Sequence, residues 1–444
     1  MTMEQVDVLV IGAGPAGTVA ASIVNKAGYK VKIVEKQQFP RFVIGESLLP
    51  RCMEALEEAG FLDAVKEHGF QEKFGAKFVK DGKICDYSFG DQFTKGWTWT
   101  WQVPRAHFDK ILADTVESMG VPISYGTAVT GIRFEKAGLG QAGATAAEGG
   151  QRAGGPVDGG GYATHSVTTV QGPDMEPYQI EAKFIIDGSG YGRVIPRLFN
   201  MEKPSDLPPR KALFVHTRDV NRSMADEPNR ITIVVHEPGV WIWIIPFSDG
   251  ITSLGFVGDP SFFAGYGDDP ERQLRALIDT QPYISERFKD VGFLFEPRSL
   301  ESWSTTTNSF YGDGFVLTGN VTEFLDPVFS SGVTLATVSS QLAAGLVIRT
   351  LKGEAVDWEN EYTKVMMQGV NTFRSYVTTW YEGVLDTIFF ADDQDPLIKS
   401  QICSVLAGYV WDTTNPYVKN HHNALHKLAS LISYRDSLRK PIIE

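Results

Sequence analysis

The sequence VDVLVIGAGPAG, residues 6–17, decides how the N-terminal part of this chain folds. A short apolar strand runs into a glycine-rich turn, followed by a helix-like segment and a second strand-like segment that ends at Glu35. Gly12 permits the tight turn, Gly14 lets the backbone approach a pyrophosphate, and Gly17 allows close packing of helix on strand. An acid at the end of the second strand can accept hydrogen bonds from both hydroxyls of a ribose. Together these features predict a dinucleotide-binding βαβ unit, whereas a lone glycine motif would indicate only a turn.

The composition is that of an ordinary globular protein, with 43% hydrophobic and 21% charged residues in a chain of 444. The 41 basic and 54 acidic residues give a net charge of −13, which disfavours a nucleic-acid or anionic-membrane partner. Cys52, Cys85 and Cys403 are widely separated, so we predict a reducing compartment and no metal site. We expect a cytoplasmic protein without a membrane span, because we find no charged leader and no apolar run approaching the length that crosses a bilayer.

A second informative stretch is FLDPVFSSGV, residues 324–333, which lies between an apolar strand-like run and a helix-like run. A Ser-Ser-Gly turn before a helix leaves unpaired backbone N–H groups at the positive end of the helix dipole. Such a turn can bind an anion. The simpler alternative is a serine N-cap followed by a glycine turn.

An alternating pattern surrounds two lysines in the first quarter of the chain. Phe74, Ala76 and Phe78 occupy one face of a predicted strand, and Lys73 and Lys77 occupy the other. The pattern alone predicts that both lysines are solvated.

Three tryptophans, Trp97, Trp99 and Trp101, alternate with threonines, so one face of a predicted strand carries three indoles. A face of this kind is either part of the core or the wall of an aromatic pocket, and the pattern does not distinguish the two.

Several motifs resemble known flavoenzymes. The glycine fingerprint resembles that of FAD enzymes of the hydroxylase type, as do Val-Pro-Arg at 103–105 with Phe-Asp at 108–109, Asp-Gly at 187–188 and Gly-Asn at 319–320. Within that group, WIWIIP at 241–246 and the FxxPxxSxG pattern at 324–332 are similar to the motifs of flavin-dependent halogenases. Lys-Phe-Gly-Ala at 73–76 stands where that family has its catalytic lysine, and Gly-Glu-Ser at 45–47 looks like its phenol and pyrrole branch.

The resemblance implies roles for individual residues. Lys73 would be catalytic, Ser331 and Gly332 would bind a halide, and the substrate pocket would include Trp241, Trp243, Phe329 and Trp380. The residues expected to bind FAD are Gly12, Gly14, Pro15, Ala16, Gly17, Glu35, Lys36, Arg41, Glu46, Ser47, Arg105, Asp187, Gly319, Asn320, Pro327, Gly332 and Val333.

The implied reaction uses reduced FAD (FADH2), O2 and chloride or bromide to form hypohalous acid, which Lys73 relays to an aromatic substrate. Phe329 stands where the tryptophan-specific branch has a glutamate, so the expected substrate is an electron-rich phenol or pyrrole, free or tethered to a carrier protein. Asn320 replaces an aspartate of most relatives, which would loosen FAD. Because no separate NAD(P) fingerprint is found, we expect a partner flavin reductase.

The expected fold class is α/β (α+β), with a Rossmann-like FAD-binding domain formed by residues 1–204 and 301–350. A flexible Gly/Ala-rich insertion is predicted at 137–161. A mixed β-sheet substrate domain is predicted at 205–300, and a helical C-terminal region at 351–444 would cover the active site. Two other functions stay open: an FAD-dependent reductase or monooxygenase of the same fold, acting for instance on isoprenoids, or a non-catalytic flavin-binding protein.

Overall fold

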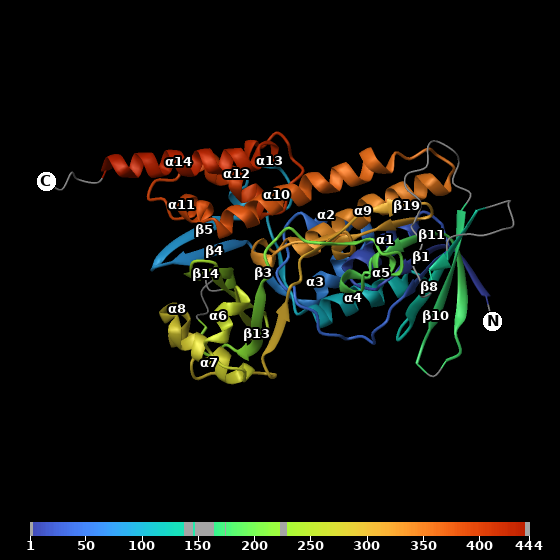
Figure 1. Cartoon of the computed structure of the whole chain (residues 1–444), viewed down its shortest axis with the longest axis horizontal. Helices are drawn as coiled ribbons and strands as arrows, with labels where there is room; N and C mark the ends of the chain where they lie inside the picture. The colour runs from blue at the N-terminus through green and yellow to red at the C-terminus, as the bar shows by residue number, and fades with distance from the viewer. Residues whose placement is uncertain (1–2, 137–144, 147–163, 174, 223–228, 440–444) are drawn as a thin grey trace.

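A computed structural model describes residues 3–136, 145–146, 164–173, 175–222 and 229–439 of the chain. It has two large sheets and a helical C-terminal layer, which confirms the predicted α/β class (Figure 1). The predicted insertion at 137–161 lies outside the described residues, apart from strand β9 (Thr145–Ala146).

The first sheet carries the glycine-rich turn. Its order is β7-β2-β1-β11-β10-β8-β9, and β20 also pairs with β11 and β19 with β20. The pairs β2–β7, β1–β2, β1–β11 and β11–β20 are parallel. The strands are β1 (Met3–Ile11), β2 (Val31–Val34), β7 (Ile123–Ser124), β8 (Ala128–Lys136), β10 (Thr164–Gln171), β11 (Tyr178–Asp187), β19 (Tyr311–Gly312) and β20 (Phe315–Leu317).

Helices α1 (Pro15–Lys26), α5 (Val194–Leu198) and α9 (Ser331–Leu351) pack on this sheet. Helices α2 (Cys52–Ala59), α3 (Leu62–His68) and α4 (Arg105–Ser118) pack against these helices or against one another. Of the described helices, α9 alone is long and apolar enough to cross a membrane, so the expectation that no apolar run reaches that length is wrong for it. About 67% of its most apolar stretch is buried, and it packs on α1 and α2, as expected of a core helix.

The second sheet has the order β17-β13-β16-β15-β14-β4-β5. Its members are β4 (Gly75–Lys80), β5 (Lys83–Ser88), β13 (Lys211–Arg218), β14 (Ile231–Glu237), β15 (Val240–Pro246), β16 (Ile251–Gly258) and β17 (Arg298–Glu301). The predicted domain ranges therefore need a correction, because residues 75–88 join this sheet through the parallel pairing of β14 with β4. Helices α6 (Pro260–Ala264), α7 (Pro270–Thr280) and α8 (Pro282–Phe288) pack on one side of it.

Two small sheets connect the larger ones. Strands β12 (Glu202–Pro204), β18 (Thr305–Thr307) and β21 (Glu323–Phe324) form one, and β3 (Gln71–Lys73) and β6 (Thr100–Gln102) form the other. The strand predicted through three tryptophans is thus confined to Trp101 and its neighbours, and Trp97 and Trp99 precede it.

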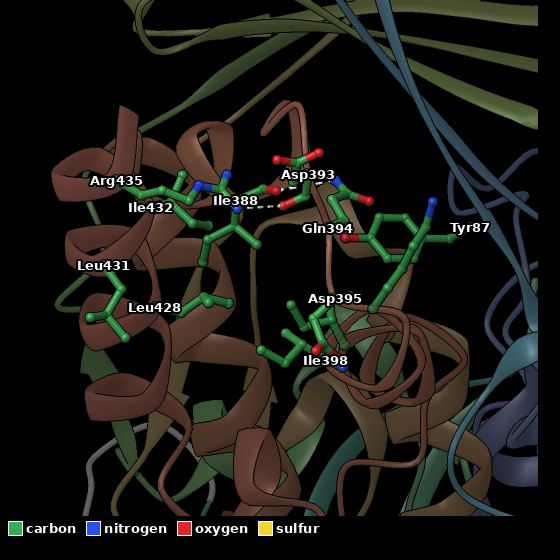
Figure 2. A pocket seen from close by; sticks show the side chains of 12 residues that line it. Tyr87, Ile388, Asp393, Gln394, Asp395, Ile398, Leu428, Leu431, Ile432 and Arg435 are labelled. Atoms are coloured by element: carbon green, nitrogen blue, oxygen red, sulfur yellow. Dashed lines mark hydrogen bonds between the residues drawn. The ribbon is translucent and has the colours of Figure 1, made fainter. Parts of the chain in front are cut away.

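The C-terminal region is helical and lies along the upper side of both sheets in Figure 1. Its helices are α10 (Lys364–Tyr381), α11 (Val384–Phe389), α12 (Pro396–Leu406), α13 (Pro416–Lys419) and α14 (His421–Arg439). A pocket of about 180 Å³ opens between α12 and α14, and Tyr87 of β5 lies in its wall (Figure 2). One continuous apolar core includes residues of both large sheets and of these helices, so the three parts are packed as one body.

Candidate active site

A cavity of about 860 Å³ lies between the first sheet, the second sheet and the N-terminal end of α9. Its size is in the range of ligand pockets in proteins. Many residues predicted to bind FAD or substrate line it: Gly12, Gly14, Pro15, Ala16, Glu35, Lys36, Arg41, Glu46, Ser47, Arg105, Trp241, Trp243, Asn320, Pro327, Gly332 and Val333.

The glycine-rich turn forms one end of the cavity. Gly12 has φ of +94°, a left-handed conformation that favours glycine. A Cβ on Gly17 would lie 1.8 Å from the Gly12 carbonyl oxygen, so only glycine fits there. Among the described residues no side chain caps α1, so its first amide groups are available to an anion, and the helix dipole favours one at this end.

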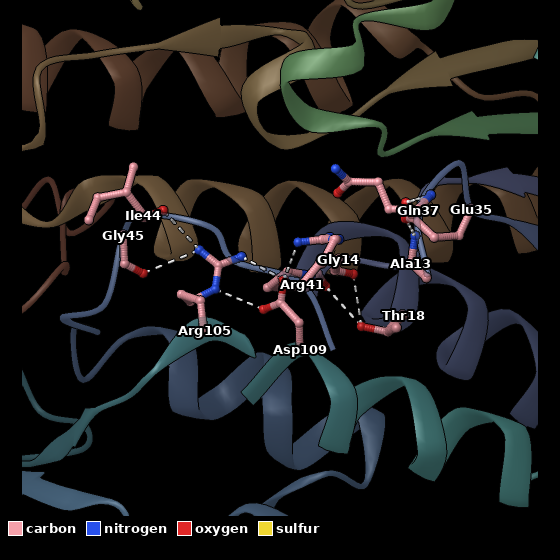
Figure 3. A network of polar contacts seen from close by, with 11 residues as sticks. Ala13, Gly14, Thr18, Glu35, Gln37, Arg41, Ile44, Gly45, Arg105 and Asp109 are labelled. Carbon is pink, nitrogen blue, oxygen red and sulfur yellow. Dashed lines mark hydrogen bonds and ion pairs between the residues drawn. The ribbon is translucent and has the colours of Figure 1, made fainter. Parts of the chain in front are cut away.

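Glu35 is held at the edge of this turn (Figure 3). Its two carboxylate oxygens accept hydrogen bonds from the backbone N–H of Ala13 at 2.8 Å and of Gln37 at 2.9 Å. The side chain is buried and lines the cavity. A carboxylate fixed in this way retains lone pairs that can accept a ribose hydroxyl.

Two arginines share one carboxylate beside the turn (Figure 3). Arg105 donates to Asp109 through Nε at 2.8 Å and Nη2 at 3.0 Å, and Arg41 Nη1 donates to Asp109 Oδ2 at 3.0 Å. Asp109 is fully buried and thus orients both guanidinium groups, which line the cavity. Arginines positioned in this way suit a pyrophosphate.

A third group of polar atoms lies on the segment before α2. Glu46 is 2% exposed, and its Oε1 lies 2.8 Å from His216 Nε2 on β13. Among the described residues, Glu46 Oε2 and Ser47 Oγ have no hydrogen-bond partner. Buried polar atoms without partners are rare, so these two atoms, on residues that line the cavity, fit a polar ligand edge.

The turn before α9 closes the cavity. Asp326 Oδ1 accepts from Val328 N at 3.1 Å, and Ser330 has φ of +56°, an uncommon value for a residue with a side chain. In the described structure no side chain caps α9, so the amide groups of Ser331 and Gly332 start the helix without a capping partner. With the glycine turn, the arginines and the polar edge, this arrangement fits FAD.

Comparison with known proteins agrees with this geometry. The sequence pattern of an FAD binding domain matches residues 5–152, and that of the tryptophan halogenase family matches residues 80–409. The chain belongs to the tryptophan halogenase family of flavin-dependent halogenases. The predicted family and enzyme class are therefore confirmed.

Individual relatives of this halogenase cover nearly its whole length. It is 25% identical to a 1H-pyrrole-2-carbonyl-[peptidyl-carrier protein] chlorinase of Pseudomonas fluorescens, over 93% of this chain and 91% of the relative. It is 26% identical to the corresponding brominase of Pseudoalteromonas luteoviolacea, over 91% and 92%. The crystal structure of a flavoprotein/dehydrogenase from Cytophaga hutchinsonii is 56% identical, with a TM-score of 0.90 over 98% of this chain and 100% of that one.

Lys73 of this halogenase is buried, with 1% of its surface exposed. Its Nζ donates to the carbonyl oxygen of Leu48 at 2.7 Å and lies 5.4 Å from the centre of the Phe89 ring. Burial lowers the pKa of this amine from 10.5 to about 7. Lys73 is not itself in the cavity wall. Its amine donates to Leu48, which directly follows Ser47, and Ser47 does line the cavity.

The prediction from alternation that Lys73 and Lys77 are solvated is wrong, since both are buried and Phe74 is 48% exposed. The predicted single strand is broken: β3 ends at Lys73, β4 starts at Gly75, and the two strands belong to different sheets. Each strand has its own inward face, so the alternation does not continue across the break.

Two residues predicted for the substrate pocket lie outside the cavity wall. Phe329 packs edge-on against Trp380 with ring centres 5.9 Å apart, and Trp380 also contacts Phe78 at 5.8 Å. Both are in the apolar core in this structure. This aromatic cluster includes Phe389, whose ring is 5.2 Å from Tyr87 in the wall of the smaller pocket of Figure 2.

Four more predicted ligand-binding residues are not in the wall. Gly17 and Gly319 serve close packing, against Gly12 and Ala336 respectively. Asp187 is fully buried, and its two oxygens accept from Ser189 N and Ile195 N, so its carboxylate holds a turn. Burial raises the pKa of Asp187. Ser331 is buried at the start of α9, between Ser330 and Gly332, which do line the cavity.

The sequence patterns did not identify three residues that the structure places at the site. Asp109, quoted only as part of a motif, orients both arginines, and His216 holds Glu46. Arg298 lines the cavity with its guanidinium 4.4 Å from the Phe42 ring centre. No local signal distinguishes His216 or Arg298, because their partners are far away in the sequence. The described residues contain no cluster of three or more His, Cys, Asp or Glu suited to a metal ion.

Proposed function

We propose that the protein halogenates an electron-rich aromatic ring with reduced FAD, O2 and chloride or bromide. Reduced FAD, when bound, would supply the two electrons that O2 needs, and the net oxidation would be FADH2 + O2 + X⁻ + H⁺ → FAD + HOX + H2O. The ring then exchanges a proton for halogen, ArH + HOX → ArX + H2O. The observation that carries the proposal is the buried Lys73 amine, bonded to the segment at the edge of the cavity.

Lys73 is suited to hold hypohalous acid. With its pKa lowered to about 7, the amine is divided between neutral and charged forms near neutral pH. The neutral form is nucleophilic and can take the halogen, and the charged form can donate a hydrogen bond to the acid. Its one hydrogen-bond acceptor among the described contacts is the Leu48 carbonyl, which bears no formal charge and so does not tie up the amine in an ion pair.

The halide is assigned to the amide groups at Ser331 and Gly332, where the start of α9 offers donors without a fixed positive charge. Trp241 and Trp243, on β15 of the second sheet, line the cavity and would keep a substrate ring away from the flavin.

The substrate is proposed to be a phenol or pyrrole, because Phe329 provides no carboxylate to activate a less electron-rich ring. Two relatives are named for a pyrrole on a peptidyl carrier protein, which supports a carrier-tethered substrate here. A separate reductase would supply reduced FAD, and a cytoplasmic location stays a prediction.

Mass spectrometry tests the proposal. A panel of phenols and pyrroles, free and as carrier-protein thioesters, is incubated with the protein, FAD, NADH, a flavin reductase and bromide. One product should gain bromine in the parent. In Lys73→Met the yield of brominated product should fall at least 100-fold, while a chemical trap still detects hypobromous acid. Lys77→Met should give the same yield as the parent.

The result also separates the alternatives. Consumption of reduced flavin with an isoprenoid alkene, without O2 or bromide, would assign the protein to the reductases of this fold. No turnover of either kind would favour a flavin-binding protein. Equal halogenation by Lys73→Met and the parent would remove the lysine from the mechanism.

A further inference from the structure

One hydroxyl group joins the three parts of the molecule. Trp241 Nε1, on β15 of the second sheet, donates to the hydroxyl oxygen of Tyr381 at 3.0 Å. The same hydroxyl donates to Asp326 Oδ2, in the turn before α9, at 2.9 Å. Tyr381 is the last residue of α10 in the helical region. The sequence separations are 140 and 55 residues, so only the tertiary fold brings this chain of hydrogen bonds together.

The chain of hydrogen bonds runs behind the cavity wall. Trp241 is in the wall, as are Leu325 and Pro327 on either side of Asp326, whereas Asp326 and Tyr381 are not. Trp241 and Asp326 are each 2% exposed. The Arg210 guanidinium lies 3.9 Å from the centre of the Tyr381 ring and fixes that ring from another side. Tyr381 thus holds two parts of the wall without touching the cavity.

The turn held in this way contains a strained residue. Ser330 has a left-handed backbone with φ of +56°, and such conformations persist only where the surroundings impose them. Ser330 N donates to Pro327 O at 2.8 Å, and Asp326 anchors the same turn, because one carboxylate oxygen accepts from Val328 N and the other from Tyr381. Donors that bind an anion are effective when they are fixed in advance.

We propose that Tyr381 is a positioning residue, which sets Trp241 and the 326–330 turn relative to each other and thereby preorganises the amide groups that bind halide. The halide role rests on the proposed function. The positioning itself can be measured without turnover.

The helix offers a matched control for removing this hydroxyl. Tyr376 lies on α10 and is fully buried, but its hydroxyl has no hydrogen-bond partner among the described residues. Tyr381→Phe removes a hydroxyl with two partners and keeps the ring under Arg210, whereas Tyr376→Phe removes one without partners. Both changes keep the aromatic volume, so a general packing effect should appear equally in both.

The first measurement uses protein labelled with ¹⁵N in its indoles, with the Trp241 N–H resonance assigned from Trp241→Phe. In Tyr381→Phe this resonance should shift and its hydrogen should exchange with solvent at least tenfold faster. In Tyr376→Phe it should stay unchanged. A Trp241 resonance that is the same in Tyr381→Phe and the parent overturns the proposal.

The second measurement is a bromide titration of the protein loaded with oxidised FAD, followed by flavin absorbance. Tyr381→Phe should raise the bromide Kd about fivefold, and Tyr376→Phe should change it less than twofold. Asp326→Asn, which cannot accept from both Val328 and Tyr381, should raise it as well and serves as the second variant if Tyr381→Phe does not fold. Equal bromide Kd values, or a parent that binds no bromide, overturn the halide role. If Tyr381→Phe changes the Trp241 resonance and the bromide Kd as expected but no aromatic substrate is halogenated by the parent, the proposed function fails and the positioning role stands.

Discussion

Lys73→Met should change how the stability of the protein depends on pH. Methionine keeps the length and apolar contacts of the lysine stem and removes its nitrogen. Lys73 is 1% exposed, and burial lowers its pKa from 10.5 to about 7. The folded chain therefore binds this proton more weakly than the unfolded chain, and the stability of the parent rises as the pH rises from 7 to 10.5.

The size of this effect follows from the pKa change. At pH 7 the buried amine costs about 4 kcal/mol, and at pH 9.5 about 1.4 kcal/mol, taking 1.36 kcal/mol per pKa unit. The variant lacks this cost but loses the hydrogen bond to Leu48 O, worth about 1 kcal/mol. The stability advantage of the variant over the parent should thus shrink by about 3 kcal/mol from pH 7 to pH 9.5.

Thermal unfolding at half-unit pH steps measures this difference. With an unfolding entropy of about 2.1 cal/mol/K per residue, 3 kcal/mol corresponds to about 3 °C in Tm for this chain. The Tm difference between Lys73→Met and the parent should fall by that amount between pH 7 and pH 9.5. Lys77→Met provides the control for loss of a buried lysine nearby. A Tm difference that stays constant within 1 °C would show that Lys73 is not buried as a largely neutral amine.

Three further predictions concern the cavity and its supports. Asn320→Asp should tighten binding of oxidised FAD several-fold in a titration, because a charged acceptor forms a stronger hydrogen bond. Weaker binding by the variant would refute the idea that Asn320 loosens FAD. Gly17→Ala should abolish FAD binding, because its Cβ would lie 1.8 Å from the Gly12 carbonyl oxygen, whereas Gly345→Ala on α9, with no atom within 4 Å, should raise Tm by about 1 °C. Burial raises the pKa of Asp326 from 3.8 to about 6, so the folded parent loses stability as the pH rises through this range. Asp326→Asn should therefore gain about 2 kcal/mol over the parent between pH 4 and pH 7 in urea unfolding, and parallel pH profiles would contradict this.

The sequence by itself determined the elements whose physics is local. The βαβ unit at the N-terminus depends on glycines at fixed spacing, which only a left-handed turn and close helix packing require. The turn before α9 could be predicted for a similar reason, because Asp-Pro and Ser-Ser-Gly favour a turn through interactions within a few residues. The position of Glu35 at the cavity follows from the βαβ unit, whereas Arg41 and Arg105 were expected there only from the resemblance to flavoenzymes.

Only the tertiary structure decided which side chains are buried and which partners they have. Lys73 is buried because its strand ends where a strand of another sheet begins, a break that alternation along the chain does not reveal. Phe329 and Trp380 fill the core instead of lining the cavity, because α10 packs against the turn before α9. Glu46 with His216, and Trp241 with Tyr381, are more than 100 residues apart. Contacts of this kind depend on how whole sheets and helices pack, and no pattern within one segment contains that information.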